Sequence, residues 1–285
     1  MIVFPNGKIN LGLRILDKRK DGFHNLTTIF YPLPLKEALE IIRNDEENNQ
    51  ESIRFSQSGD AVDGDSTDNL CVKAYHLLKS DFPELPAVKM HLHKAIPMGA
   101  GLGGGSADAA FALKMLNDKF QLNLSVNQLL NYSLQLGSDC PFFIINLPCL
   151  ASGRGEILDP VNLSLAGYDL LLINPGIHVN TGWAFSHLNI SVGITNSNSI
   201  TQHKNLANII SQSPSNWAGD LINDFEIPIF SRYPELKVLK KELYRRGAIY
   251  AAMSGTGSTL FGLYEKGKSP TLHLPLHYYV KTLPL

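Results

Sequence analysis

The stretch that decides the fold is PMGAGLGGGSADAA, residues 97–110, in which five glycines are followed at once by a helix-forming sequence. Apolar and polar residues alternate over 87–93, so the predicted order is strand, loop, helix. Glycines let backbone N–H groups approach an anion, and the free N–H groups and partial positive charge of a helix start strengthen that contact. The stretch is therefore typical of a phosphate-binding loop.

Two other phosphate loops and a plain linker compete with this interpretation. Gly99, Gly101 and Gly104 fit the dinucleotide pattern G-x-G-x-x-G. A dinucleotide fold needs a further strand with an acidic end, however, and residues 117–125 form a polar connection into another helix. A Walker loop needs Gly-Lys-Ser/Thr, whereas Ser106 follows glycine directly. Flexible glycine linkers seldom lie between a strand and a capped helix, so the context favours a phosphate loop of another kind.

Length and composition limit the class of protein. The 285 residues exceed the usual size of one hydrophobic core, so two domains are expected, and 44% hydrophobic with 18% charged residues is typical of a globular protein. A formal charge of -1 with scattered basic residues predicts no nucleic-acid partner, and no apolar run is long enough to predict a membrane span. Three cysteines without a C-x-x-C pair, and an N-terminus without signal-peptide features, predict reduced thiols and a cytoplasmic protein.

Periodicity predicts the elements around the loop. Residues 8–16 alternate strictly, which predicts a strand with one buried face, carrying Ile9 and Leu11, and one open face, carrying Lys8 and Asn10. Further strands are predicted over 26–31, 38–43, 87–93 and 169–174. Helices are predicted after a cap at Asp68 or Asn69, from Ser106, from Ser125 to Gly137 and over 233–247.

Turn residues mark a change of domain. Pro148, Gly153, Gly155 and Pro160 interrupt the chain, so we expect an N-terminal domain over 1–155 and a C-terminal domain over 156–285. The last residues, 267–285, are expected to supply a closing strand.

The glycine-rich loop resembles that of the GHMP kinases, a family that includes galactokinase, homoserine kinase and mevalonate kinase. The resemblance extends along nearly the whole chain and narrows to the branch that phosphorylates a cytidine diphosphate-linked methylerythritol. It is carried by four further segments: KINLGLRILDKRKDGFHNL (8–26), GSDCPFF (137–143), NPGIHVNTGWAF (174–185) and MSGTGSTLFGLY (253–264).

The resemblance implies an α+β fold of two domains. The N-terminal one would be like domain 2 of ribosomal protein S5, the C-terminal one would be a ferredoxin-like α/β sandwich, and the active site would lie between them. Alternatives are a relative that acts on another small alcohol, such as homoserine or mevalonate, and a non-catalytic nucleotide-binding protein. An aromatic clamp from Phe23 and Phe185 favours a nucleotide-linked substrate, and the presence of both Lys8 and Asp139 argues against a protein without catalysis.

Phosphoryl transfer needs a carboxylate to accept the hydroxyl proton and a cation to stabilise charge. From the residues alone, Asp139 is equally well a helix cap or a solvated loop aspartate, and Lys8 is more simply a lysine in solvent. The resemblance implies that Asp139 is the base and that Lys8, beside it, orients and activates the substrate hydroxyl.

The resemblance also implies the substrate contacts. Cytosine would stack between Phe23 and Phe185 while His24 contacts the edge of the base, although aromatic side chains of this kind are as readily core residues. Phe23 stands where many relatives have tyrosine, so a contact by that hydroxyl is lost. The alcohol and its diphosphate would meet Asn10, Thr181 and the second glycine-rich stretch, Ser254, Gly255, Thr256 and Gly257.

ATP is the implied cofactor, with Mg²⁺ brought by its phosphates and coordinated largely by phosphate and water, Ser106 being a possible contact. His91 and His93 share a strand face, but the pattern favours structural histidines over a metal site. The protein is expected to be a monomer or weak homodimer. The implied nucleotide contacts are Asn69, Lys94 and the loop itself: Pro97, Met98, Gly99, Ala100, Gly101, Leu102, Gly103, Gly104, Gly105, Ser106 and Ala107.

Overall fold

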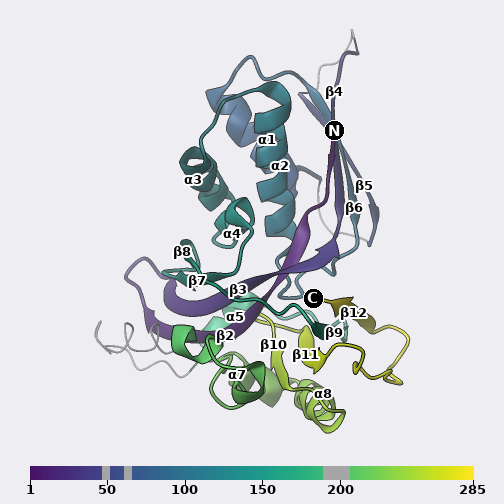
Figure 1. The fold of residues 1–285 in the computed structure, drawn as a ribbon. Coiled ribbons are helices and arrows are strands. Elements are labelled where there is room, and N and C mark those ends of the chain that lie inside the picture. The colour runs from purple at the N-terminus through teal and green to yellow at the C-terminus, as the bar shows by residue number, and fades with distance from the viewer. Residues whose placement is uncertain (47–51, 61–65, 189–205) are drawn as a thin grey trace. The chain divides into compact units, whose positions relative to one another are not determined.

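The computed structural model describes residues 1–46, 52–60, 66–188 and 206–285 (Figure 1). Within this part the chain forms two compact units, each assembled from three separate segments. Unit 1 contains Met1–Gly7, Leu35–Met98 and Gly103–Asn146, and unit 2 contains Lys8–Pro34, Gly99–Leu102 and Leu147–Leu285. The single domain boundary near residue 155 divides the chain differently from these units, and it stays a prediction.

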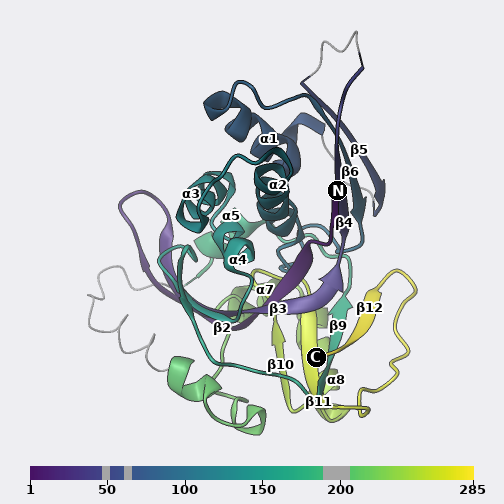
Figure 2. The same ribbon diagram turned by 45° about the horizontal axis from the view of Figure 1, so that its top comes forward.

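Unit 1 is a four-stranded sheet with helices on one face. The sheet has the order β1-β4-β6-β5, in which β4 pairs antiparallel with β1 and β6, and β5 pairs parallel with β6. Figures 1 and 2 show α1 and α2 lying together on one face of it. The elements are β1 (Ile2–Val3), β4 (Ala38–Arg43), β5 (Ile53–Gly59), α1 (Leu70–Asp81), β6 (Val88–Lys94), α2 (Gly104–Phe120), α3 (Val126–Leu136) and α4 (Cys140–Ile145).

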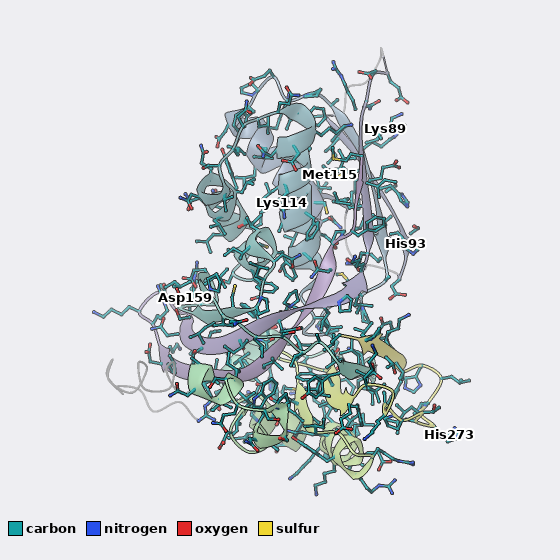
Figure 3. All side chains as sticks on the ribbon, viewed as in Figure 1. Lys89, His93, Lys114, Met115, Asp159 and His273 are labelled. Atoms are coloured by element: carbon teal, nitrogen blue, oxygen red, sulfur yellow. The ribbon has the colours of Figure 1, made fainter. Side chains whose placement is uncertain are left out.

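The two faces of the unit 1 sheet differ in the burial of their side chains, because the helices cover only one of them. Met115 on α2 is buried between helix and sheet, whereas His93 on β6 is exposed on the opposite face (Figure 3). His91 and His93 bond to serine hydroxyls of the neighbouring β5, with Ser58 Oγ 2.9 Å from His91 Nε2 and 3.0 Å from His93 Nδ1.

Unit 2 contains two further sheets. The first has the order β2-β3-β7-β8, and the second has the antiparallel order β10-β11-β9-β12 and is packed against α8. The elements are β2 (Asn6–Lys18), β3 (His24–Lys36), β7 (Cys149–Ser152), β8 (Ile157–Pro160), β9 (Tyr168–Asn174), α5 (Thr181–Ser186), α7 (Glu226–Arg232), α8 (Pro234–Arg245), β10 (Tyr250–Met253), β11 (Leu260–Glu265) and β12 (Tyr279–Pro284). The first two residues of β2 and the last two of β3 belong to unit 1.

Local sequence signals placed about half of these elements. The predicted strand 38–43 coincides with β4, and Asn69 caps α1 by accepting a hydrogen bond from Cys71 N at 2.9 Å. Ser125 and Gln128 form the predicted capping box of α3, and the predicted closing strand is β12, which pairs with β9.

Two predictions about strand and helix were wrong in detail. The helix after the loop begins at Gly104 and not at Ser106, because its N-cap is a glycine in the left-handed conformation, Gly103, and not a side-chain cap. Both faces of β2 are buried near its start, since Lys8 is 3% and Asn10 is 2% exposed. Alternation shows which residues share a face, but it cannot show that the second face is covered as well.

Among the residues that the structure describes, no helix combines the length and apolar character needed to span a membrane.

Candidate active site

The glycine-rich loop has the backbone that its sequence predicts. Gly99, Gly101 and Gly103 have positive φ angles of 62°, 78° and 74°, a conformation that other residues adopt at a cost. The loop leads into α2, a helix of 17 residues whose N-cap makes no side-chain hydrogen bond. A helix start without a side-chain cap leaves N–H donors for another acceptor, and phosphate oxygens fit that need. ATP phosphates are therefore compatible with this loop.

Close packing within unit 2 explains why Gly101 must be glycine. A Cβ atom added there would lie 2.0 Å from the backbone oxygen of Ser254. Ser254 Oγ donates to Gly101 O at 2.8 Å, and Thr259 N donates to Ala100 O at 3.3 Å. The second glycine-rich stretch thus lies directly against residues 99–102.

Lys8 and Asn10 form a buried polar pair on β2. Lys8 Nζ donates to Asn10 Oδ1 at 2.7 Å and to Gly101 O at 3.3 Å, and it lies 5.0 Å from the centroid of the Phe30 ring. Asn10 Nδ2 donates to Thr28 Oγ1 at 3.0 Å. The alternative that Lys8 is a lysine in solvent is wrong, because neighbouring polar atoms and an aromatic face hold its ammonium inside the protein.

The second glycine-rich stretch connects β10 to β11 and brings several predicted substrate residues together. Ser254 is fully buried and accepts a hydrogen bond from Asn10 N at 3.3 Å. Gly255 and Gly257 have positive φ angles of 58° and 85°. Thr256 Oγ1 lies 3.5 Å from the hydroxyl of Thr181, at the start of α5.

The three predicted aromatic side chains are arranged differently from a simple clamp. The His24 ring stacks on Phe185, with ring centroids 4.7 Å apart and planes 15° from parallel, and Phe185 also meets the edge of Phe225. Phe23 is half exposed, and the guanidinium of Arg154 lies 4.6 Å from its ring centroid. Burial, with a smaller effect of Lys18, lowers the pKa of His24. A base that stacks on this face of Phe185 has to displace His24.

Asp139 lies in unit 1, directly before α4. It occupies the N-cap position of that helix but makes no capping hydrogen bond, so the alternative of a helix-capping aspartate is wrong. The next residue, Cys140, is buried and hydrogen-bonded to Ser106 of α2, and burial raises the pKa of its thiol to about 12. Asp139, the predicted base, is therefore next in sequence to a residue that contacts Ser106 at the start of α2.

The two nucleotide contacts predicted outside the loop have structural partners in unit 1. Asn69 is the side-chain cap of α1. Lys94 is 2% exposed, and its ammonium lies 2.6 Å from Glu37 Oε2 and 2.8 Å from Asp108 Oδ2. Glu37 Oε1 also accepts hydrogen bonds from the backbone of Ala95 and Ile96, where the chain enters the loop. A nucleotide contact by Asn69 or Lys94 stays a prediction.

Sequence reasoning missed several residues that support the site, because their contacts are distant along the chain. Asn223 Nδ2 donates to Met253 O and Gly255 O, on either side of Ser254. A polar residue inside the apolar run LINDF was the available signal. The stacking of Arg154 on Phe23 had no such signal, since arginine in a turn is ordinarily exposed.

Among the described residues, no three His, Cys, Asp or Glu side chains form a group that could hold a metal ion. The oxygen-bearing side chains on α2 fit a magnesium ion bound to a nucleotide only in part. Asp108 is already paired with Lys94, and Ser106 is hydrogen-bonded to Cys140.

Comparison with known proteins identifies the family. The model of the GHMP kinases N terminal domain matches residues 69–146, and that of the GHMP kinases C terminal matches 200–272. A curated relative from Bacteroides fragilis, a 4-diphosphocytidyl-2-C-methyl-D-erythritol kinase, is 51% identical over 93% of this chain and 92% of its own length. One of the same name from Azobacteroides pseudotrichonymphae is 44% identical over 98% of this chain and 100% of its own.

Solved structures of kinases are similar to this chain as well. A crystal structure of 4-(cytidine 5'-diphospho)-2C-methyl-D-erythritol kinase has a TM-score of 0.73 at 29% identity and covers 92% of this chain and 90% of its own. A homoserine kinase from Cytophaga hutchinsonii has a TM-score of 0.64 at 17% identity, covering 92% of this chain and 86% of its own, which shows the fold alone.

The chain belongs to the GHMP kinases. It has their two-domain fold of mixed α and β content, and it is an enzyme of the kinase class. Its relatives at 44–51% identity carry the name of one particular kinase, 4-diphosphocytidyl-2-C-methyl-D-erythritol kinase.

Proposed function

We propose that this kinase transfers the γ-phosphoryl group of ATP to the 2-hydroxyl of 4-diphosphocytidyl-2-C-methyl-D-erythritol, a step of the non-mevalonate route to isoprenoid precursors. The observation that carries the proposal is identity of 44–51% along more than nine-tenths of the chain to kinases named for this substrate. Similarity over so much of the length includes both halves of the chain and every motif that the sequence analysis singled out.

The proposed transfer uses one base and one cation. The carboxylate of Asp139 accepts the proton of the 2-hydroxyl, the hydroxyl oxygen forms a bond to the γ-phosphorus, and the bond from that phosphorus to the β–γ bridging oxygen breaks to release ADP. Lys8 stabilises the charge that develops on the hydroxyl oxygen. Its hydrogen bonds to Asn10 and Gly101 fix the ammonium in advance, which lowers the cost of reorganisation during the reaction.

The nucleotide is proposed to bind along the glycine-rich loop. Backbone N–H groups of the loop and of the first turn of α2 hold the phosphates, and this turn is not capped by a side chain. Mg²⁺ would arrive with ATP and be held largely by phosphates and water, with the Ser106 hydroxyl as a protein contact.

The alcohol substrate is proposed to bind through its cytidine group and its diphosphate. Cytosine stacks on Phe185 and Phe23, and His24, once displaced from Phe185, contacts the edge of the base. The neutral form of His24 is favoured because its pKa is lowered, so the ring can both donate and accept a hydrogen bond. The diphosphate meets the stretch from Ser254 to Gly257. We further propose a cytoplasmic enzyme that is a monomer or weak homodimer.

The test is ADP release by the purified protein with magnesium-ATP. The cytidylyl substrate is compared with the methylerythritol phosphate that lacks the cytidylyl group, and with homoserine and mevalonate. Turnover with the cytidylyl compound alone supports the kinase reaction and the aromatic contacts together. Turnover with one of the other alcohols would contradict the substrate assignment while leaving the family in place.

A further inference from the structure

Asn223 is a buried polar residue that no catalytic role explains. Asn223 is 1% exposed, and its three side-chain hydrogen bonds are all to backbone atoms. Nδ2 donates to Met253 O at 2.7 Å and to Gly255 O at 2.8 Å, and Oδ1 accepts from Phe225 N at 3.0 Å. Because two partners are carbonyl oxygens and one is an N–H group, the positions of Nδ2 and Oδ1 in the side-chain amide are determined.

The two carbonyl groups that Asn223 binds lie on either side of Ser254. These hydrogen bonds hold the peptide plane between Met253 and Ser254 and the plane between Gly255 and Thr256. The neighbouring Glu226 adds a third contact, since its Oε1 accepts from Met253 N at 2.9 Å. The start of the second glycine-rich stretch is therefore held from one side by a single segment, residues 223–226.

The same segment is tied to β2. Leu13 N donates to Ile222 O and Asp224 N donates to Leu13 O, each at 2.8 Å. Asp224 Oδ2 accepts from Ile15 N at 2.8 Å. These contacts connect the strand that carries Lys8 and Asn10 to the segment that holds the glycine-rich stretch.

Ser254 completes the connection. Its hydroxyl donates to Gly101 O at 2.8 Å and receives a hydrogen bond from Asn10 N at 3.3 Å. Lys8 Nζ reaches the same two residues, at Asn10 Oδ1 and Gly101 O. Displacing Ser254 would therefore disturb the partners of the proposed catalytic lysine as well as the proposed diphosphate contacts.

We propose that Asn223 is a positioning residue for the reaction: by binding the carbonyl groups that flank Ser254, it sets the glycine-rich stretch 254–257 and, through Ser254, the partners of Lys8. Asn223 itself touches neither substrate nor ATP. The inference rests on the proposed function for its effect on turnover, but its effect on the glycine-rich stretch can be measured without any substrate.

The experiment compares Asn223→Ala with the wild type at a temperature well below unfolding. Losing the hydrogen bonds to both carbonyl groups predicts a loss of kcat/KM for the cytidylyl substrate of about thirtyfold, which corresponds to about 2 kcal/mol. Hydrogen exchange of the peptide that contains 253–258 should be faster, and exchange in unit 1 unchanged. Asn223→Ser, which keeps one small donor, should give an intermediate loss and serves if the alanine variant folds poorly.

Asn117→Ala is the matched control, because Asn117 Oδ1 accepts from Leu124 N at 2.8 Å in unit 1, away from every proposed site residue. Its kcat/KM should stay within about twofold of wild type. A double-mutant cycle with Ser254→Ala separates positioning from stability. Asn223→Ala and Ser254→Ala should combine with much less than the sum of their effects, because they act through one segment, whereas Asn117→Ala and Ser254→Ala should add.

Three results would overturn the inference: unchanged hydrogen exchange at 253–258 in Asn223→Ala, a kcat/KM within about twofold of wild type, or full additivity with Ser254→Ala. If the wild type does not turn over the cytidylyl substrate, the proposed function fails, and the exchange measurement still decides whether Asn223 positions the stretch.

Discussion

Replacing Lys94 by methionine tests how unit 1 holds the entry to its phosphate loop. The ammonium lies between the carboxylates of Glu37 and Asp108, and all three side chains are 3% exposed or less. Methionine has a similar length and removes only the charge and the donors. Glu37 would keep its hydrogen bonds from Ala95 N at 3.2 Å and Ile96 N at 2.9 Å but would lose its cation.

The expected loss follows from leaving a buried carboxylate without its partner. Removing one member of a buried ion pair costs about 3–5 kcal/mol, because the remaining charge stays out of water without compensation. At about 2–4 °C for each kcal/mol, the unfolding midpoint should fall by about 10 °C. The matched control is Lys73→Met, which breaks the exposed pair with Asp68 at 3.0 Å and should cost less than about 1 kcal/mol.

Replacing Asp108, in contrast to replacing Lys94, should stabilise the protein. Burial raises the pKa of Asp108 well above its usual range. The neighbouring Lys94 lowers this pKa and Glu37 raises it, but burial has the largest effect. The folded state then binds more protons than the unfolded state, so the free energy of unfolding falls as pH rises from the usual aspartate pKa toward the raised value. Asp108→Asn imitates the neutral acid and removes this slope, so its stability relative to wild type should improve as the pH rises above the usual aspartate pKa of about 4.

Chemical denaturation of the wild type and the three variants, followed at several pH values, measures both effects. A cost below about 1 kcal/mol for Lys94→Met would show that the buried charges are not held as an ion pair. An Asp108→Asn variant whose free energy of unfolding keeps the pH dependence of the wild type would refute the reasoning about the pKa of Asp108.

Three further predictions concern the site itself. Asp139→Asn should lower kcat by about 10²- to 10⁴-fold while ATP binding, measured by calorimetry, is kept; a retained rate removes Asp139 as the base. Gly101→Ala should abolish most activity and lower the unfolding midpoint, because its Cβ would meet Ser254 O at 2.0 Å, whereas Gly176→Ala, with the same φ of 78° but open space, should cost only about 1–2 kcal/mol. Equal effects of the two would show that the close contact does not matter. Phe185→Leu should raise KM for the cytidylyl substrate by about tenfold and leave KM for ATP unchanged, and an unchanged KM for both would contradict base stacking there.

The sequence predicted the features that depend on neighbours within a few residues. Helix α8 begins at Pro234 and buries Leu236, Leu239 and Leu243, as its periodicity required. The glycine-rich loop and the helix that follows it were predictable because glycine spacing and a helix start are both local properties. Capping at Asn69 was equally local.

What the sequence could not show depends on contacts between distant segments. The burial of Lys8 follows from Gly101 and Phe30, and periodicity within one strand contains no information about either. Asn223 acts on a carbonyl 30 residues further along the chain. The stacking of His24 on Phe185 joins the start of β3 to α5, so the aromatic residues were found but their arrangement was not.

The alternation of the chain between the two compact units has a consequence for synthesis. Six segments imply five passages from one unit to the other. Unit 1 has all of its segments once residue 146 is made, whereas β2 and β3 belong to a unit whose longest segment, Leu147–Leu285, emerges last. During synthesis on the ribosome, β2 and β3 cannot complete their sheet until β7 and the residues beyond it have been made. Until then these two strands expose apolar surface to which chaperones can bind. A cut near residue 155 should therefore leave unit 1 whole but divide unit 2, so activity should return only when the two fragments are mixed.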